Sequence, residues 1–140
     1  MEINTIKEFK YKGFECYINR VGFDKGQSIR EAISLTGSED FSMRRWWLCG
    51  YVVLPGDHPL NGEHYDDIND VVDVHEGLTF SDNGDRNTWI IGFDCNHAND
   101  GDKENTEEFV VSEIQKLIDQ LLDPNKDLRA MIEDPAWGEK

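Results

Sequence analysis

Basic residues are scarce in this chain. Of its 140 residues, 14 are lysine or arginine and 29 are aspartate or glutamate, which gives a formal net charge of −15. Such a charge repels nucleic acids and anionic membranes, so we expect no direct binding to either. It favours basic partners, including protein surfaces built to hold nucleic acid. High solubility is the alternative explanation of the same charge.

Long apolar runs are absent as well. No run reaches the roughly 18 apolar residues that a membrane-spanning helix needs. The first twenty residues mix charged with apolar side chains and contain no apolar block of the signal-peptide kind. We therefore expect a cytoplasmic protein. A chain of this length forms one domain by default, and it can bury a core without disulfide bonds.

Cysteine is infrequent, with Cys16, Cys49 and Cys95 in the whole chain. An odd number of cysteines in a cytosolic protein argues against a disulfide framework. Each thiol is therefore expected either to fill a small apolar space in the core or to bind a metal ion.

The pattern of apolar residues predicts an α+β fold. The predicted elements are a hairpin at 9–18, a short helix at 27–36, strands at 46–54 and 88–93, one or two short strands within 71–80 with Gly77 between them, a long helix at 106–122 and a short helix around 126–133. Both faces of strand 46–54 are mostly apolar, so we expect it at the centre of the sheet. The long helix has a continuous apolar stripe, and Asn105 with Glu108 is its predicted capping pair. We predict a mostly antiparallel central sheet, with the long C-terminal helix and one or two short helices packed on it.

Titratable side chains are concentrated in the loops between the central strands. All four histidines lie between positions 58 and 97, and the window 57–100 contains eleven acidic residues and one basic residue. Imidazole, thiolate and carboxylate groups together bind transition metals, and zinc is the metal that this mixture favours. We predict a zinc site within residues 46–102. Its candidate ligands are His58, His75, Asp94, Cys95 and His97, and the sequence leaves open whether Cys49 joins them.

The geometry of this site is not determined by the sequence. The polar residues that follow strands 46–54 and 88–93 come together if the two strands are parallel or joined by a longer connection. They do not converge if the strands are antiparallel neighbours, unless a loop folds back. Cys95 and His97 are also closer in sequence than the ligand pairs of zinc fingers. In the alternative interpretation Asp94 caps a turn, Cys95 packs in the core and His97 is exposed.

Three blocks of the sequence resemble a family of small, mostly uncharacterised proteins encoded by phages and their bacterial hosts. The blocks are WWLCGYVVLPGDHPL, DVHEGLTF and WIIGFDCNHANDGD, which fall within residues 46–102. Typical members have a Cys-Gly-Tyr-Val strand, a His-Pro loop, a His-Gly-Gly-Leu-Thr turn and a Gly-Phe-Asp-Cys-x-His run. Glu76 stands where these members usually have glycine. In size, acidity and metal-binding character the chain is also similar to zinc-containing type II anti-CRISPR proteins of streptococcal phages.

The second resemblance implies a protein of the host cytosol that inhibits a host defence nuclease by stoichiometric binding. The implied partner is the RNA-guided nuclease of a type II CRISPR system, and the zinc would be structural, with four protein ligands. The alternative function is a metal-dependent hydrolase of a nucleotide or phosphoester. Its metal ligands would be His58, His75, Asp94 and His97. Asp100 or Glu76 would then act as the general base for metal-bound water.

Overall fold

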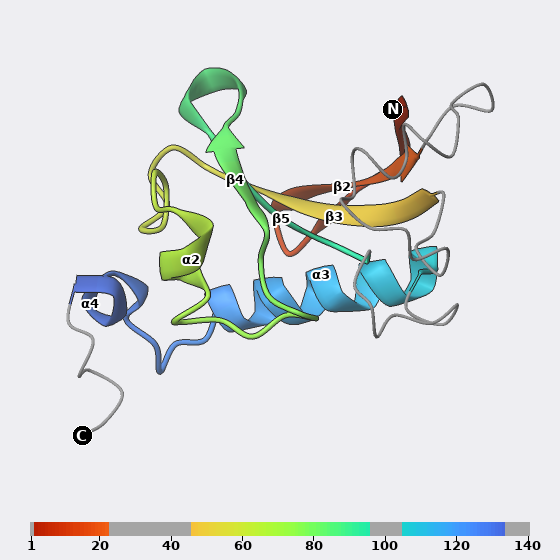
Figure 1. The fold of residues 1–140 in the computed structure, drawn as a ribbon. Coiled ribbons are helices and arrows are strands. Elements are labelled where there is room, and N and C mark those ends of the chain that lie inside the picture. The colour runs from red at the N-terminus through yellow and green to blue at the C-terminus, as the bar shows by residue number, and fades with distance from the viewer. Residues whose placement is uncertain (1, 23–45, 96–104, 134–140) are drawn as a thin grey trace.

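Five antiparallel strands form one sheet in the order β1-β2-β3-β5-β4 (Figure 1). The computed structural model describes residues 2–22, 46–95 and 105–133. The strands are β1 (Glu2–Tyr11), β2 (Phe14–Gly22), β3 (Trp46–Leu54), β4 (Phe80–Asn83) and β5 (Trp89–Asp94). The helices in this part of the chain are α2 (Tyr65–Ile68), α3 (Glu107–Leu121) and α4 (Leu128–Glu133), and a 3-10 turn spans Asp85–Asn87.

The α+β architecture predicted from the sequence is confirmed. β3 is the central strand, with β2 and β5 as its antiparallel neighbours. Figure 1 shows α2, α3 and α4 on the same side of the sheet, which we call the inner face; the opposite side is the outer face. The predicted helix at 27–36 lies outside the described residues. None of the helices in the described ranges is long and apolar enough to cross a membrane.

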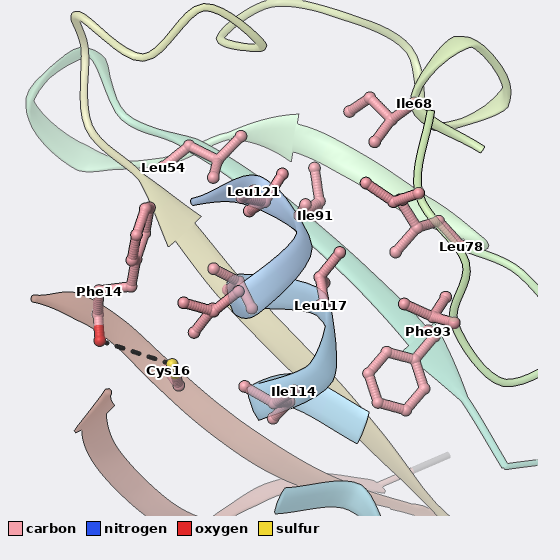
Figure 2. Packing of buried hydrophobic residues seen from close by; sticks show 14 of the residues in the cluster. Phe14, Cys16, Leu54, Ile68, Leu78, Ile91, Phe93, Ile114, Leu117 and Leu121 are labelled. Atoms are coloured by element: carbon pink, nitrogen blue, oxygen red, sulfur yellow. Dashed lines mark hydrogen bonds between the residues drawn. The ribbon is translucent and has the colours of Figure 1, made fainter. Parts of the chain in front are cut away.

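The apolar stripe of α3 closes the core over the inner face (Figure 2). Its fully buried side chains pack with equally buried side chains of the sheet. These residues are Val110, Ile114, Leu117 and Ile118 from α3, and Ile18, Val52, Leu54, Ile91 and Phe93 from the strands. Burying one such side chain contributes roughly 1.5–3 kcal/mol relative to leaving it exposed. The packing of α3 on the sheet is therefore a main source of stability.

Segment 71–79 is not the strand that its valines predicted. The valines are buried in the core, but backbone N–H groups of the segment bind side chains of α3. The Asp73 N–H donates to Gln120 Oε1 at 2.7 Å, and the His75 N–H donates to Glu113 Oε1 at 2.7 Å. Because these side chains take the place of a neighbouring strand, the segment lies along α3 as a loop, and the strand β4 follows it.

The start of α3 differs from the predicted cap. Thr106 is the N-cap, and its hydroxyl accepts the Phe109 N–H at 3.2 Å. Asn105 is buried, and its Oδ1 accepts the Leu48 N–H of β3 at 2.9 Å. Pairing between β3 and β5 ends one residue away from Leu48, so the Asn105 amide substitutes for a strand partner. The predicted capping pair of Asn105 with Glu108 was wrong for this reason.

The hairpin predicted at 9–18 is confirmed as the β1–β2 hairpin, which turns at Lys12-Gly13. Both residues have positive φ, 49° and 89°, as two-residue hairpin loops of type I′ require. Lys12 Nζ lies 2.7 Å from Asp119 Oδ1 of α3, and the Tyr11 hydroxyl donates to the same carboxylate oxygen at 3.1 Å. These contacts are exposed to solvent, so they orient the hairpin against α3 more than they stabilise it.

Candidate functional site

The three sequence blocks meet at one end of the sheet. Cys49 of β3 and Asp94 of β5 are directly opposite one another in the two strands. Thr79, in the block that contains His75, donates its hydroxyl to Asp94 Oδ2 at 3.2 Å and its N–H to Gly92 O at 2.9 Å. Segments far apart in sequence therefore share one end of the fold.

His58 lies at the other end of the sheet. Its ring is edge-on to Phe14 at the start of β2, with ring centroids 5.9 Å apart, and its Nδ1 accepts the Leu60 N–H at 3.1 Å. Because β3 and β5 are antiparallel, the end of β3 that leads to His58 is about 17 Å of strand away from Asp94. His58 therefore does not share an ion with Asp94 in this fold.

The environment of His58 favours its neutral form. Burial lowers the pKa of His58 below its usual value of 6.5, and the nearby Asp57 carboxylate offsets part of that effect. The bond from the Leu60 N–H also requires an unprotonated Nδ1, because a protonated ring nitrogen cannot accept. His58 thus organises the turn that follows β3.

His75 lies beside α3. Its ring is edge-on to Phe109, with centroids 5.0 Å apart, and its N–H donates to Glu113. These contacts belong to the N-terminal half of α3, which also approaches β3 near Leu48 through Asn105. His75 is therefore at the same end of the molecule as Asp94.

Asp94 and Cys95 face opposite sides of the sheet. The Asp94 side chain is on the outer face, where Thr79 binds it. Cys95 is fully buried in the core, and its N–H donates to Leu48 O at 2.9 Å. Successive residues of an extended chain point in opposite directions, so one ion cannot be reached by both side chains without a local rearrangement.

Of the remaining candidates, Glu76 is exposed in the turn after His75, and His97 and Asp100 lie outside the described residues. Within residues 2–22, 46–95 and 105–133, no group of three or more His, Cys, Asp or Glu side chains is placed to hold a metal ion. The described residues alone therefore do not fit a zinc site. The zinc predicted from the sequence stays a prediction.

Cys49 is a buried thiol on the outer side of β3. Burial and the neighbouring Asp94 carboxylate together raise the pKa of the Cys49 thiol to about 12. The thiolate is the reactive form of cysteine, so Cys49 is expected to be unreactive at neutral pH.

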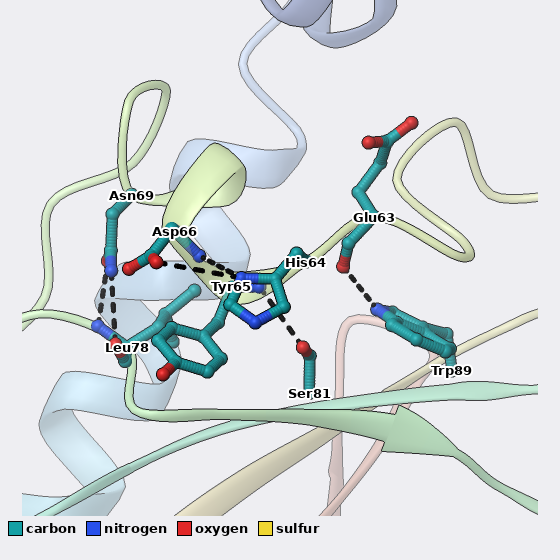
Figure 3. Close-up of polar contacts among 8 residues, drawn as sticks. All are labelled: Glu63, His64, Tyr65, Asp66, Asn69, Leu78, Ser81 and Trp89. Carbon is teal, nitrogen blue, oxygen red and sulfur yellow. Dashed lines mark hydrogen bonds and ion pairs between the residues drawn. The ribbon is translucent and has the colours of Figure 1, made fainter.

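His64 caps α2 (Figure 3). Its Nδ1 accepts the Asp66 N–H at 3.2 Å, and its ring lies 4.2 Å from the Tyr65 ring, centroid to centroid. At the other end of α2, Asn69 is joined to Leu78 by two hydrogen bonds of 3.0 and 2.7 Å. His64 is exposed, and the sequence did not indicate its capping role.

A row of aromatic side chains crosses the outer face. The rings of Tyr17 and Tyr51 are stacked, with centroids 4.7 Å apart, and Phe80 meets Tyr51 edge-on at 5.5 Å. Gly92 lies between Tyr51 and Phe80 in the sheet register, and its missing side chain leaves room for the Tyr51 ring. The sequence does not reveal this row, because its members come from three strands whose register the sequence leaves open.

A groove of about 730 Å³ adjoins this row on the outer face. Its apolar lining includes Val53 and Ile90, and Tyr17 contributes an aromatic ring. Its charged lining residues are Glu8, Lys10, Glu15, Asp85 and Arg86. The last two belong to the turn between β4 and β5, so this turn forms one end of the groove.

Two surfaces of the described residues are distinguished by their composition. One surface is the acidic connection between β3 and β5, and the other is the groove beside the aromatic row. No protein-family model, no curated protein and no solved structure matches this chain.

Proposed function

We propose that this protein acts by stoichiometric binding to a basic protein surface, without turnover. The partner we propose is a host defence nuclease, the RNA-guided nuclease of a type II CRISPR system. The mode of action is inferred from the charge of the molecule, and the class of partner is inferred from the resemblance described above.

The observation that carries this proposal is the charge of segment 55–85, which makes up most of the connection from β3 to β5 and is followed by Arg86, the one basic residue of that connection. The segment contains no lysine or arginine, and its nine carboxylates are Asp57, Glu63, Asp66, Asp67, Asp70, Asp73, Glu76, Asp82 and Asp85. Most of them are exposed. Lys116 of α3 lies 3.8 Å from the Asp73 carboxylate and offsets part of its charge. The other carboxylates keep the surface strongly negative. Such a surface accelerates association with a basic nucleic-acid channel and competes for it.

The alternative, a metal-dependent hydrolase, has less support. It requires His58 and Asp94 on one ion, and the antiparallel pairing of β3 with β5 places Asp94 about 17 Å of strand away from the end of β3 that leads to His58. A phosphate-rich substrate would also have to approach the nine carboxylates of segment 55–85, with Arg86 as the one basic residue in the connection from β3 to β5 to meet it.

The test is a titration of DNA cleavage by a purified type II RNA-guided nuclease with its guide. We expect inhibition to be complete near one equivalent of protein. It should weaken with salt, since the Debye length falls from about 10 Å at 0.1 M to about 3 Å at 1 M. Inhibition far below one equivalent that grows with time and leaves a modified guide or substrate would instead indicate an enzyme.

A matched pair of double variants tests whether the carboxylates of segment 55–85 accelerate association with the partner. Asp66→Asn with Asp67→Asn removes two exposed carboxylates from the first turn of α2. Glu107→Gln with Glu108→Gln removes two from the first turn of α3, which lies outside the acidic connection. We expect the first pair to slow association severalfold more than the second. Equal effects of the two pairs would show that net charge, and not this surface, governs binding.

A further inference from the structure

We infer that the groove on the outer face receives an extended, arginine-bearing segment of a partner protein. The guanidinium would lie against the Tyr17 ring and beside the carboxylates of Glu8 and Glu15. This inference deepens the proposed function, on which it rests for the basic character of the partner. The acidic connection attracts that partner from a distance, and the groove holds it in contact.

The first support is the charge of the groove. Glu8, Glu15 and Asp85 line it, and among the described residues none of these three forms an ion pair. Lys10 is the partner of Glu15 in the sheet register, and Arg86 follows Asp85 in sequence, but the three carboxylates outnumber these two cations and form no ion pair with them. A partner cation can therefore replace water at these carboxylates. Lys10 and Arg86, also on the lining, can donate to the carbonyl oxygens of an extended segment.

The second support is the position of the aromatic ring. Glu8 of β1 is directly opposite Tyr17 of β2 in the sheet register. One face of the Tyr17 ring is stacked on Tyr51, so its other face is on the side of Glu8. A carboxylate next to an aromatic face suits arginine, whose planar guanidinium both stacks on rings and forms paired hydrogen bonds with carboxylates. The compact ammonium of lysine does this less well.

The third support is that the apolar part of this face is uncovered in the described part of the chain, where the helices lie on the inner face (Figure 1). Phe80 is 38% exposed, and Tyr17, Val53 and Ile90 are half-buried. Aromatic residues and arginine are enriched at the energetic centres of protein interfaces. A second copy of the chain fits less well, because two molecules of charge −15 repel one another.

The experiment uses the full chain and two probes, hexa-arginine amide and hexalysine amide, with binding followed by calorimetry and by NMR shifts of backbone amides. We expect hexa-arginine to bind at least threefold more tightly than hexalysine. We also expect the largest shifts at Tyr17, Glu15 and Asp85. Equal affinity for the two probes, or shifts centred on segment 63–76, would refute the inference.

Four variants separate contact from net charge. Glu15→Gln removes one carboxylate of the groove and should weaken hexa-arginine binding at least threefold. Glu108→Gln removes one exposed carboxylate from α3 and should change affinity by less than twofold. Tyr17→Leu should abolish the preference for arginine, whereas Tyr17→Phe should retain it. Thermal midpoints of all variants show whether the fold is kept, and equal weakening by Glu15→Gln and Glu108→Gln overturns the assignment.

Two further outcomes are informative. Concentration-dependent dimerisation without peptide, with shifts on the outer face, would identify a second copy as the occupant and contradict the inference. The peptide measurement needs no nuclease, so it fails or succeeds independently of the cleavage titration. Arginine-selective binding without nuclease inhibition would support the inference about the groove and contradict the nuclease as partner.

Discussion

The Tyr51 ring lies over Gly92, its partner in the sheet register. A Cβ atom at Gly92 would be 2.5 Å from Tyr51 Cδ1 and 2.9 Å from Gly50 O. On the other side of the sheet, a Cβ at Gly50 would be 2.8 Å from Phe93 Cζ and from Val110 Cγ1. The two glycines therefore allow the aromatic row on one face and the close approach of α3 on the other.

Gly92→Ala is predicted to destabilise the protein by about 1–3 kcal/mol, because the Tyr51 ring or the β3 backbone has to shift. Gly56→Ala is the control, since the nearest atom to its added Cβ is Asn87 O at 3.4 Å. Chemical denaturation of both variants measures the difference. A Gly92→Ala protein as stable as Gly56→Ala would mean that Tyr51 does not occupy this position.

Leu117→Ala is predicted to reduce the free energy of unfolding by about 2–5 kcal/mol, because Leu117 is fully buried between α3 and the sheet. Leu122, at the end of the same helix, is 46% exposed, so Leu122→Ala should have a much smaller effect. An unchanged thermal midpoint for Leu117→Ala would place the helix away from the core.

The stability of the protein should depend on the protonation of His58. Its pKa is lower in the folded state than the ordinary value of 6.5, so the unfolded chain binds a proton first as the pH falls. The contribution of His58 is then fully present above about pH 6.5 and is lost as the pH falls through the folded pKa. The wild type should lose more stability than His58→Ala between pH 6.5 and 5. Parallel pH profiles of the two proteins would contradict this prediction.

The zinc prediction is tested by elemental analysis of freshly purified protein. Because His58 is at the opposite end of the sheet from Asp94, we expect His58→Ala to leave the zinc content unchanged. His75→Ala and His97→Ala should lower it. A wild-type protein purified without chelators that contains no stoichiometric zinc would rule out the metal site altogether.

Local patterns in the sequence determined much of the fold. The apolar stripe of residues 106–122 gave α3, because a 3.6-residue repeat needs no knowledge of distant residues. The two apolar faces of strand 46–54 placed β3 at the centre of the sheet. Segment 71–79 was mistaken for a strand because its valines are buried, and the sequence does not reveal that their backbone binds Gln120 and Glu113.

The candidate site depended on relationships that no local pattern carries. The acidity of segment 55–85 is a property of the sequence, and so is the collection of histidines around it. Strand direction decided that His58 and Asp94 are at opposite ends, and register decided that Tyr17, Tyr51 and Phe80 form one row. Both strand direction and register are set by the pairing of strands that are distant in sequence. A shift of the register by one residue would turn each side chain to the other face of the sheet. Composition thus determined the charge of the molecule, and tertiary structure decided which side chains act together.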